Sequence, residues 1–125
     1  MVMGDELSRV LGPLEAEVMQ VMWPAGEPLG VRAVLDEMND GRDAPLAYTT
    51  VMTVMARLAE KEILRRRREG RGYVYEPVVA DAAGIAVRNV VRDFGEAAVS
   101  GFVDQARADP KLRARLERLL AEDPS

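Results

Sequence analysis

The sequence predicts a mainly α-helical protein with one small β-hairpin. The first observation is helical spacing, because apolar residues recur at i, i+3, i+4 and i+7 in Val51, Val54, Met55 and Leu58. The second is alternation, because Tyr73, Val74 and Tyr75 follow a glycine and end before a proline, which is typical of a strand. The third is a run of four arginines at residues 65–68, which precedes that strand and predicts its partner.

Composition excludes several kinds of chemistry. The 125-residue chain has no cysteine and no histidine, which removes disulfides, thiolate metal sites and the commonest acid–base side chain. We therefore expect no metal site and no cofactor. No apolar run approaches the roughly 18 residues that span a bilayer, and the first residues do not resemble a signal peptide. We accordingly expect a cytoplasmic protein.

Charge is distributed unevenly along the chain. The net charge of −4 arises from −6 in residues 1–46, +3 in residues 47–76 and −1 in residues 77–125. Positive charge is thus confined to the segment that holds the predicted helix and hairpin. A basic segment of this kind indicates an anionic partner, although the whole chain is acidic.

Two shorter helices precede the helix over residues 48–61. Residues 1–11 show no clear period and are expected to form a frayed tail. The first helix begins at Gly12-Pro13, since proline is favoured in the first turn, and is expected to end at Trp23-Pro24. A very short strand is expected at Pro28-Leu29, and the second helix covers residues 31–38.

The next elements complete a recognisable arrangement. Strands are expected over residues 63–68 and 72–76, joined by the turn EGRG. Three short helices, the last two forming a helix-turn-helix pair, followed by a basic hairpin predict a winged helix-turn-helix domain over residues 1–78. Such a domain binds DNA.

Residues 79–125 predict a separate helical region. One long helix is expected over residues 81–103, and Asp109-Pro110 is expected to cap and begin a final helix. Two amphipathic helices without a third partner are expected to pair with a second copy, although folding back on the same chain is an alternative. The candidate dimerisation residues are Val87, Val90, Val91, Phe94, Phe102, Leu112, Leu116 and Leu119.

The outward face of the helix over residues 48–61 is small and polar at its beginning. A major groove is about 12 Å wide, and threonine hydroxyl and methyl groups can bond or touch base edges there. The N-terminal residues of such a helix contact bases. The candidate DNA-contacting residues on this helix are Tyr48, Thr49, Thr50, Met52, Thr53 and Arg57. The alternative is that the threonines are only caps and surface residues.

Further candidates carry guanidinium groups. Strand alternation places Arg65 and Arg67 on one face of the hairpin, and both are expected to contact DNA phosphates. Arg71 lies at the expected turn, where it could reach phosphates or the minor groove. Arg32, near the start of the second helix, is a weaker phosphate candidate. Tyr73 and Tyr75 are expected to pack the hairpin against the helices.

No enzyme site is expected. Serine occurs only at Ser8, Ser100 and Ser125, without an accompanying base, and no glycine-rich phosphate loop is present. Two other functions stay open. One is a protein-interaction module whose acidic first segment binds a basic partner. The other is a regulator with a small-molecule pocket between two copies.

The segments LGPLEAEVMQVMW, VRAVLDEM, AYTTVMTVMARLAEKEIL and GRGYVYEP resemble the BlaI/MecI (penicillinase repressor) family of winged-helix regulators. The resemblance implies a homodimeric repressor that binds an inverted-repeat operator in double-stranded DNA. It also implies release after a membrane sensor peptidase triggers cleavage, here at Gly101-Phe102. The best-known members have asparagine before the phenylalanine, whereas this chain has Gly101. Glu62 stands where the family commonly has glycine at a helix end, so the left-handed exit is expected to be either strained or built differently.

Overall fold

The computed structural model describes the backbone of residues 2–122 and the side chains of residues 6–122. Met1 and residues 123–125, which the predicted domains include, lie outside the described residues. The chain forms two compact units, Met1–Arg88 and Asn89–Ser125. The predicted boundary after residue 78 lies earlier than this division, which falls within a helix.

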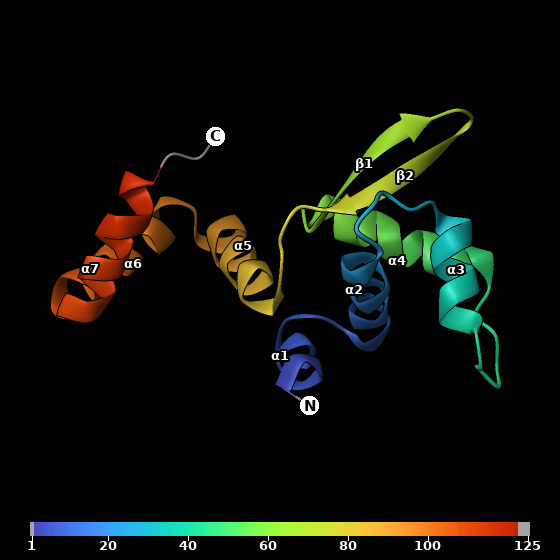
Figure 1. Cartoon of the computed structure of the whole chain (residues 1–125), viewed down its shortest axis with the longest axis horizontal. Coiled ribbons are helices and arrows are strands. Elements are labelled where there is room, and N and C mark those ends of the chain that lie inside the picture. Colours follow the sequence, from blue (N-terminus) through green and yellow to red (C-terminus); the bar gives the residue numbers. More distant parts are fainter. Residues whose placement is uncertain (1, 123–125) are drawn as a thin grey trace. The chain divides into compact units, whose positions relative to one another are not determined.

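Three helices form the centre of the first unit (Figure 1). They are α2 (Pro13–Ala25), α3 (Val31–Asn39) and α4 (Tyr48–Glu60), and each packs against the other two. Their buried side chains share one apolar core, which includes Val18, Met19, Met22, Val34, Leu35, Val51, Met55 and Leu58. The predicted helix-turn-helix pair is therefore α3 and α4.

The N-terminal segment was predicted wrongly as a frayed tail. It forms α1 (Val2–Val10), and Leu7 and Leu11 from this segment are buried in the core of the first unit. The Leu11 N–H donates to the Leu7 carbonyl at 2.9 Å. Two leucines one turn apart are too few to give a visible period, but they are sufficient to anchor a short helix against a core.

The end of α2 also differs from the prediction. Pro24 lies inside the last turn, and the helix continues to Ala25 before Gly26 adopts φ 68°. A glycine in the left-handed conformation is a common helix end, because no Cβ opposes it. The left-handed Gly26, and not the proline, therefore marks the end of α2.

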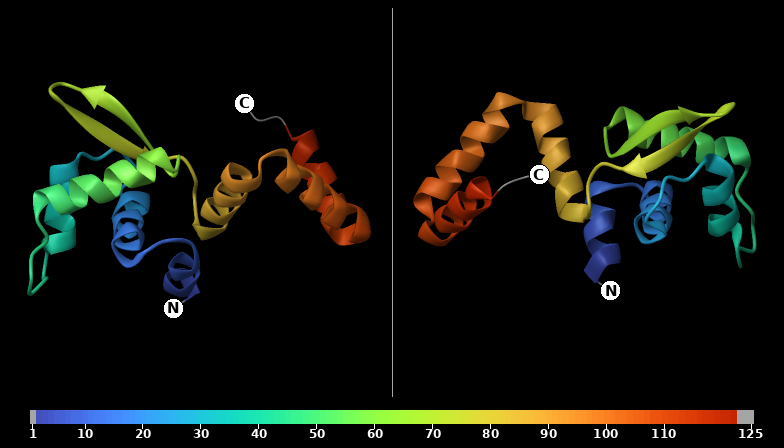
Figure 2. Two further views of the ribbon diagram at one scale, coloured as in Figure 1. Left: turned by 180° about the vertical axis from the view of Figure 1, so that it is seen from behind. Right: turned by 45° about the horizontal axis from the view of Figure 1, so that its top comes forward.

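The hairpin consists of β1 (Leu64–Glu69) and β2 (Gly72–Pro77) in antiparallel register. Only Gly70 and Arg71 separate the strands, and they are the central residues of the expected turn EGRG, which Glu69 and Gly72 close as a pair. Leu29 adds a bridge to β2: its N–H donates to the Tyr75 carbonyl at 2.9 Å and its carbonyl accepts from the Tyr75 N–H at 2.8 Å. The expected short strand near Leu29 is thus a single bridge. β1 packs on α4 and β2 on α2 (Figure 2).

The first unit continues beyond the hairpin. The Trp23 indole N–H donates to the Val79 carbonyl at 2.9 Å, and Ala82 and Ile85 at the start of α5 (Ala82–Phe94) are buried in the core. A Cβ on Gly84 would lie 3.0 Å from the Val79 Cβ, so glycine permits this close packing. These contacts explain why the first compact unit reaches Arg88.

The predicted single helix over residues 81–103 is wrong. The segment forms α5 and α6 (Glu96–Ala108), which are separated by Gly95 at φ 57° and ψ −128°. Only glycine adopts that region readily, so the break has a local cause. The final helix, α7 (Pro110–Ala121), begins as predicted, because Asp109 accepts hydrogen bonds from the amides of Lys111 and Leu112. In the described part of the chain, three helices and not two follow the hairpin.

Candidate nucleic-acid interface

Helix α4 has one apolar and one exposed face. Val51, Val54, Met55 and Leu58 are buried, as their spacing predicts. The side chains on the opposite side are exposed, and these are Thr49, Met52, Thr53, Arg57 and Glu60. Thr50 is only half-buried, so it lies at the border of the exposed face. Tyr48 is exposed as the first residue of the helix, but it lies on the same side as Val51 and Met55. The other residues predicted to contact DNA thus share one continuous helix surface, with Thr50 at its edge.

The beginning of α4 has no side-chain cap. Ala47 occupies the capping position and offers no side-chain acceptor to the first amides of the helix. Such amides can bond a phosphate oxygen, which the positive end of the helix dipole also attracts. The Arg32 guanidinium carbon lies 5.2 Å from the centroid of the Tyr48 ring. The structure therefore brings Arg32 beside the start of α4.

The hairpin register separates its arginines into two chemically different pairs. Arg65 lies opposite Glu76 and Arg67 opposite Val74, whereas Arg66 lies opposite Tyr75 and Arg68 opposite Tyr73. Because side chains alternate across a strand, the first pair and the second pair occupy opposite faces.

Carboxylates accompany the first pair. Arg65 Nη2 lies 2.9 Å from Glu76 Oε1, and Arg67 Nη2 lies 3.3 Å from Glu69 Oε2. The two strand arginines predicted as DNA contacts are thus the ones with acidic neighbours. An approaching phosphate would have to compete with these carboxylates for them.

An aromatic ring accompanies the second pair. The guanidinium carbons of Arg66 and Arg68 lie 4.4 Å and 5.9 Å from the centroid of the Tyr73 ring. Tyr75 is buried as expected, but Tyr73 is 42% exposed, so the expectation that Tyr73 packs against the helices is wrong. Tyr73 lies too near the hairpin tip to reach the core.

Sequence reasoning missed Arg66, Arg68 and Tyr73 as a group. A signal was available in the dipeptide Gly70-Arg71, because a two-residue turn sets Glu69 opposite Gly72 and thereby every pair behind it.

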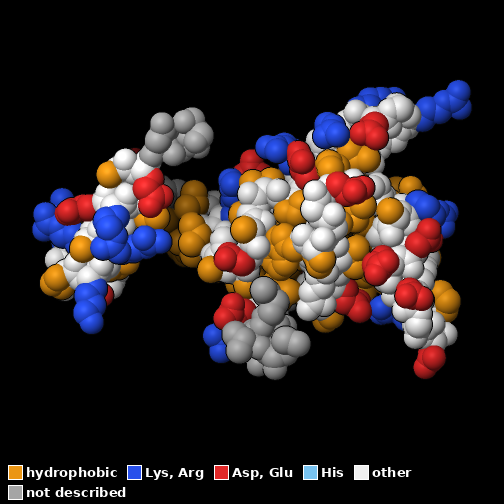
Figure 3. Space-filling view, in the orientation of Figure 1, with side chains coloured by type: hydrophobic (Ala, Val, Ile, Leu, Met, Phe, Trp, Pro, Cys, Tyr) orange, Lys and Arg blue, Asp and Glu red, His pale blue; other side chains and the backbone are white. Residues whose placement is uncertain are grey.

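Arg71 is exposed at the hairpin tip, beside Gly70 at φ 61°. Arginine side chains extend along the hairpin to its end, whereas acidic side chains are prominent over the neighbouring helices (Figure 3). The hairpin is therefore the part of the first unit that presents cationic groups farthest from the core.

The exit from α4 is built around Glu62. Its φ is 61°, the only positive value at a non-glycine residue in the described part of the chain. The Ile63 N–H donates to the Leu58 carbonyl and the Glu62 N–H to the Ala59 carbonyl, both at 3.0 Å. These two bonds define a Schellman end, so Glu62 adopts the left-handed conformation that glycine commonly has there, which is the strained form of the two that were expected. Arg88 Nη1 lies 3.6 Å from Glu62 Oε2.

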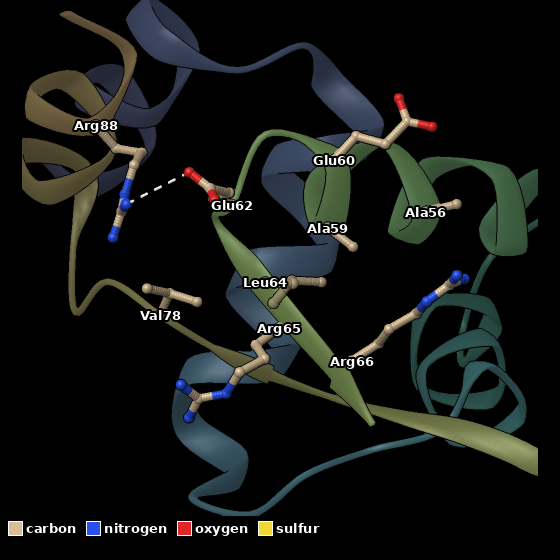
Figure 4. A pocket seen from close by; sticks show the side chains of 9 residues that line it. All are labelled: Ala56, Ala59, Glu60, Glu62, Leu64, Arg65, Arg66, Val78 and Arg88. Atoms are coloured by element: carbon tan, nitrogen blue, oxygen red, sulfur yellow. Dashed lines mark ion pairs between the residues drawn. The ribbon is translucent and has the colours of Figure 1, made fainter. Parts of the chain in front are cut away.

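An open groove of about 500 Å³ lies between α4 and the base of the hairpin. In Figure 4 the Arg66 side chain extends toward the α4 side that carries Ala56, whereas Arg65 leaves the strand in the opposite direction. The lining residues are Ala56, Ala59, Glu60, Glu62, Leu64, Arg65, Arg66, Val78 and Arg88. The groove thus lies between Arg66 on β1 and the side of α4 that carries Ala56, Ala59 and Glu60.

The second unit exposes most of the candidate dimerisation residues. The exposed ones are Val87, Val90, Val91, Phe94, Phe102 and Leu119, of which Val87 belongs to the first unit, and Leu112 and Leu116 are half-buried. Val90, Phe94 and Phe102 line a shallow apolar hollow together with Ala97, Ala98, Gly101 and Gln105. Gly101 and Phe102, the candidate cleavage pair, lie inside α6, so cleavage there requires local opening of the helix.

Within residues 6–122, no group of three or more acidic side chains is placed to hold a metal ion. The same part of the chain contains no helix long and apolar enough to cross a membrane.

Known proteins resemble this chain over most of its length. The penicillinase repressor family matches residues 11–122. The transcriptional regulator BlaI from two Mycobacterium tuberculosis strains, CDC 1551 / Oshkosh and ATCC 25618 / H37Rv, is 40% identical over 119 residues, which cover 90% of this chain and 83% of each relative. The solution structure of the DNA binding domain of the repressor BlaI has 28% identity and a TM-score of 0.50, and covers 58% of this chain and 84% of that one. The chain therefore belongs to the penicillinase repressor family of transcriptional regulators.

Proposed function

We propose that this chain is a homodimeric repressor that binds double-stranded DNA, with α4 in the major groove and the hairpin on the adjacent phosphates. The observation that carries the proposal is the join between two surfaces. Ala56, Ala59 and Glu60 of α4 line the same groove as Arg65 and Arg66 of β1. The similar solved structure is a DNA binding domain of the repressor BlaI, which supports DNA as the partner of this chain.

The two surfaces have different tasks. Thr49, Met52 and Thr53 are exposed on α4, carry no charge and can touch base edges or thymine methyl groups. The hairpin arginines supply the electrostatic attraction that does not depend on sequence. Since residues 1–46 carry a net charge of −6, the hairpin must offset repulsion between the rest of the domain and DNA.

A second copy of the chain accounts for the exposed apolar residues of the second unit. Phe94 is 66% exposed and Phe102 is 48% exposed. Apolar residues clustered around one hollow indicate a surface that is covered in the functional protein. A homodimer with two-fold symmetry would bind two half-sites whose centres lie about 10 bp apart.

A footprint on genomic fragments selected by the full chain tests this function. We expect a protected inverted repeat and an affinity that falls steeply between low and moderate salt. Absence of any protected site, with the protein folded, would instead favour the protein-interaction alternative. Loss of binding on replacing Thr53, with a retained salt response, would link the protected bases to α4.

A further inference from the structure

We propose that Tyr73 is a positioning residue that holds Arg66 and Arg68 in place for DNA phosphates. The inference rests on the proposed DNA-binding function and assigns the phosphate contacts to one face of the hairpin. The DNA phosphates are then contacted by Arg66 and Arg68, which share the Tyr73 ring, and not by Arg65 and Arg67.

The strand register places both arginines within reach of the Tyr73 ring. Arg68 is the direct cross-strand partner of Tyr73, and Arg66 lies two residues away on the same face. Cross-strand and diagonal neighbours on one face are within reach of aromatic and long side chains. One ring therefore contacts two guanidinium groups, at 4.4 Å and 5.9 Å from its centroid.

The four arginines of β1 differ in their charged neighbours. No ion pair of Arg66 or Arg68 with a carboxylate is found among the described residues, whereas Arg65 and Arg67 lie beside Glu76 and Glu69. A guanidinium on an aromatic face keeps its full positive charge and its N–H donors. A guanidinium beside a carboxylate attracts a phosphate less, because the two charges partly cancel.

The Tyr73 ring also limits the rotamers that the two arginine side chains can adopt. A free arginine side chain has many rotamers, and fixing it on a phosphate has an entropic cost. The Tyr73 ring restricts Arg66 and Arg68 before DNA arrives, which lowers that cost. Tyr73 is itself 42% exposed and has no place in the core, so holding these side chains is the role that its surroundings support.

The test measures binding of the full chain to a labelled random-sequence duplex of about 30 bp over a range of salt, because phosphate contacts do not depend on sequence. The variants are Tyr73→Thr, which removes the ring, and Tyr73→Phe, which keeps it. The Arg66→Ala/Arg68→Ala and Arg65→Ala/Arg67→Ala double variants complete the set. Thermal melting of each variant verifies the fold.

We expect Tyr73→Thr to weaken binding about fivefold and to reduce the salt slope by about one, although it removes no charge. Tyr73→Phe should bind within twofold of the original chain. In the Arg66→Ala/Arg68→Ala background, Tyr73→Thr should have no further effect. The Arg65→Ala/Arg67→Ala variant should lose less affinity than the Arg66→Ala/Arg68→Ala variant.

An unchanged salt slope in Tyr73→Thr would overturn the inference, and so would an equal loss of affinity in Tyr73→Phe, which would point to the hydroxyl group. A further loss in the Arg66→Ala/Arg68→Ala background would overturn it as well. These failures leave the proposed function intact, because the original chain still binds. If the original chain binds no duplex, the proposed function itself fails.

Discussion

The side-chain amide of Asn39 makes two hydrogen bonds with the backbone of Leu46. Asn39 Oδ1 accepts from the Leu46 N–H at 2.8 Å, and Asn39 Nδ2 donates to the Leu46 carbonyl at 3.1 Å. Asn39 is the last residue of α3, and Leu46 precedes the first turn of α4. One amide thus closes the connection between the two helices of the helix-turn-helix pair.

Replacing this amide should loosen the connection. In Asn39→Asp the acceptor remains, but a carboxylate oxygen replaces the N–H group that faces the Leu46 carbonyl. We expect a loss of about 1–3 kcal/mol of unfolding free energy, because both groups are partly buried. Chemical denaturation measures the loss. Asp40→Ala, at the exposed neighbouring position, is the matched control, and an equal effect there would contradict the role of Asn39.

Glu62→Gly should stabilise the protein. Glu62 has φ 61°, a conformation that costs a residue with a Cβ about 1–2 kcal/mol and costs glycine little. The Arg88 and Glu62 side chains of the ion pair are 35% and 69% exposed. Loss of the ion pair should therefore change the free energy of unfolding little. After allowing for the greater freedom of glycine in the unfolded chain, we expect a gain of about 1 kcal/mol.

Thermal unfolding of Glu62→Gly and Glu62→Ala distinguishes the two contributions. Glu62→Ala removes the carboxylate but keeps the strained conformation, so its midpoint should stay close to that of the original chain. A stabilisation of both variants to the same extent would show that the charge, and not the backbone, determines the effect.

Sequence reasoning located several elements whose causes are local, although it missed the break at Gly95. The faces of α3 and α4 follow from apolar spacing, and the start of α7 from Asp109. It did not find α1, because that helix depends on the burial of Leu7 and Leu11 in a distant core. Tertiary contacts of this kind leave no period in a short segment.

One part of the candidate interface was predictable from the sequence and the other was not. The exposed face of α4 follows directly from the position of its apolar face. The pairing of the arginines does not, because it depends on the strand register, and one residue in turn length changes every cross-strand neighbour. Arg65 and Arg67 were predicted as the phosphate contacts, although Arg66 and Arg68 are the pair that shares Tyr73.

Thr53→Ala should reduce sequence discrimination. Thr53 is exposed in the second turn of α4, where a hydroxyl group can bond a base edge. We expect a cost of about 1–3 kcal/mol at one base position, with a smaller change on unrelated DNA. Competition with operators that carry single base changes measures it. An equal loss on every sequence would assign Thr53 to the phosphates instead.

Arg71→Ala should weaken binding to all sequences alike. Arg71 is exposed at the hairpin tip, where it is expected to reach the DNA phosphates or the minor groove. The slope of log affinity against log salt should decrease by about one, as expected for one phosphate contact. Selective loss at a single base pair would show direct base reading by this residue.

Phe102→Glu should dissociate the proposed dimer. Phe102 lines the apolar hollow of the second unit and is 48% exposed, so the change disturbs the single chain little. In the dimer, the second copy would cover the new glutamate and leave its carboxylate without a partner, at a desolvation cost of several kcal/mol. We therefore expect the dissociation constant of the dimer to rise at least about a hundredfold. Sedimentation over a range of concentrations measures the mass. Ser100→Glu places the same charge at an exposed polar position of α6 and should remain dimeric. If both variants keep the mass of the original chain, the hollow is not the surface that joins two copies.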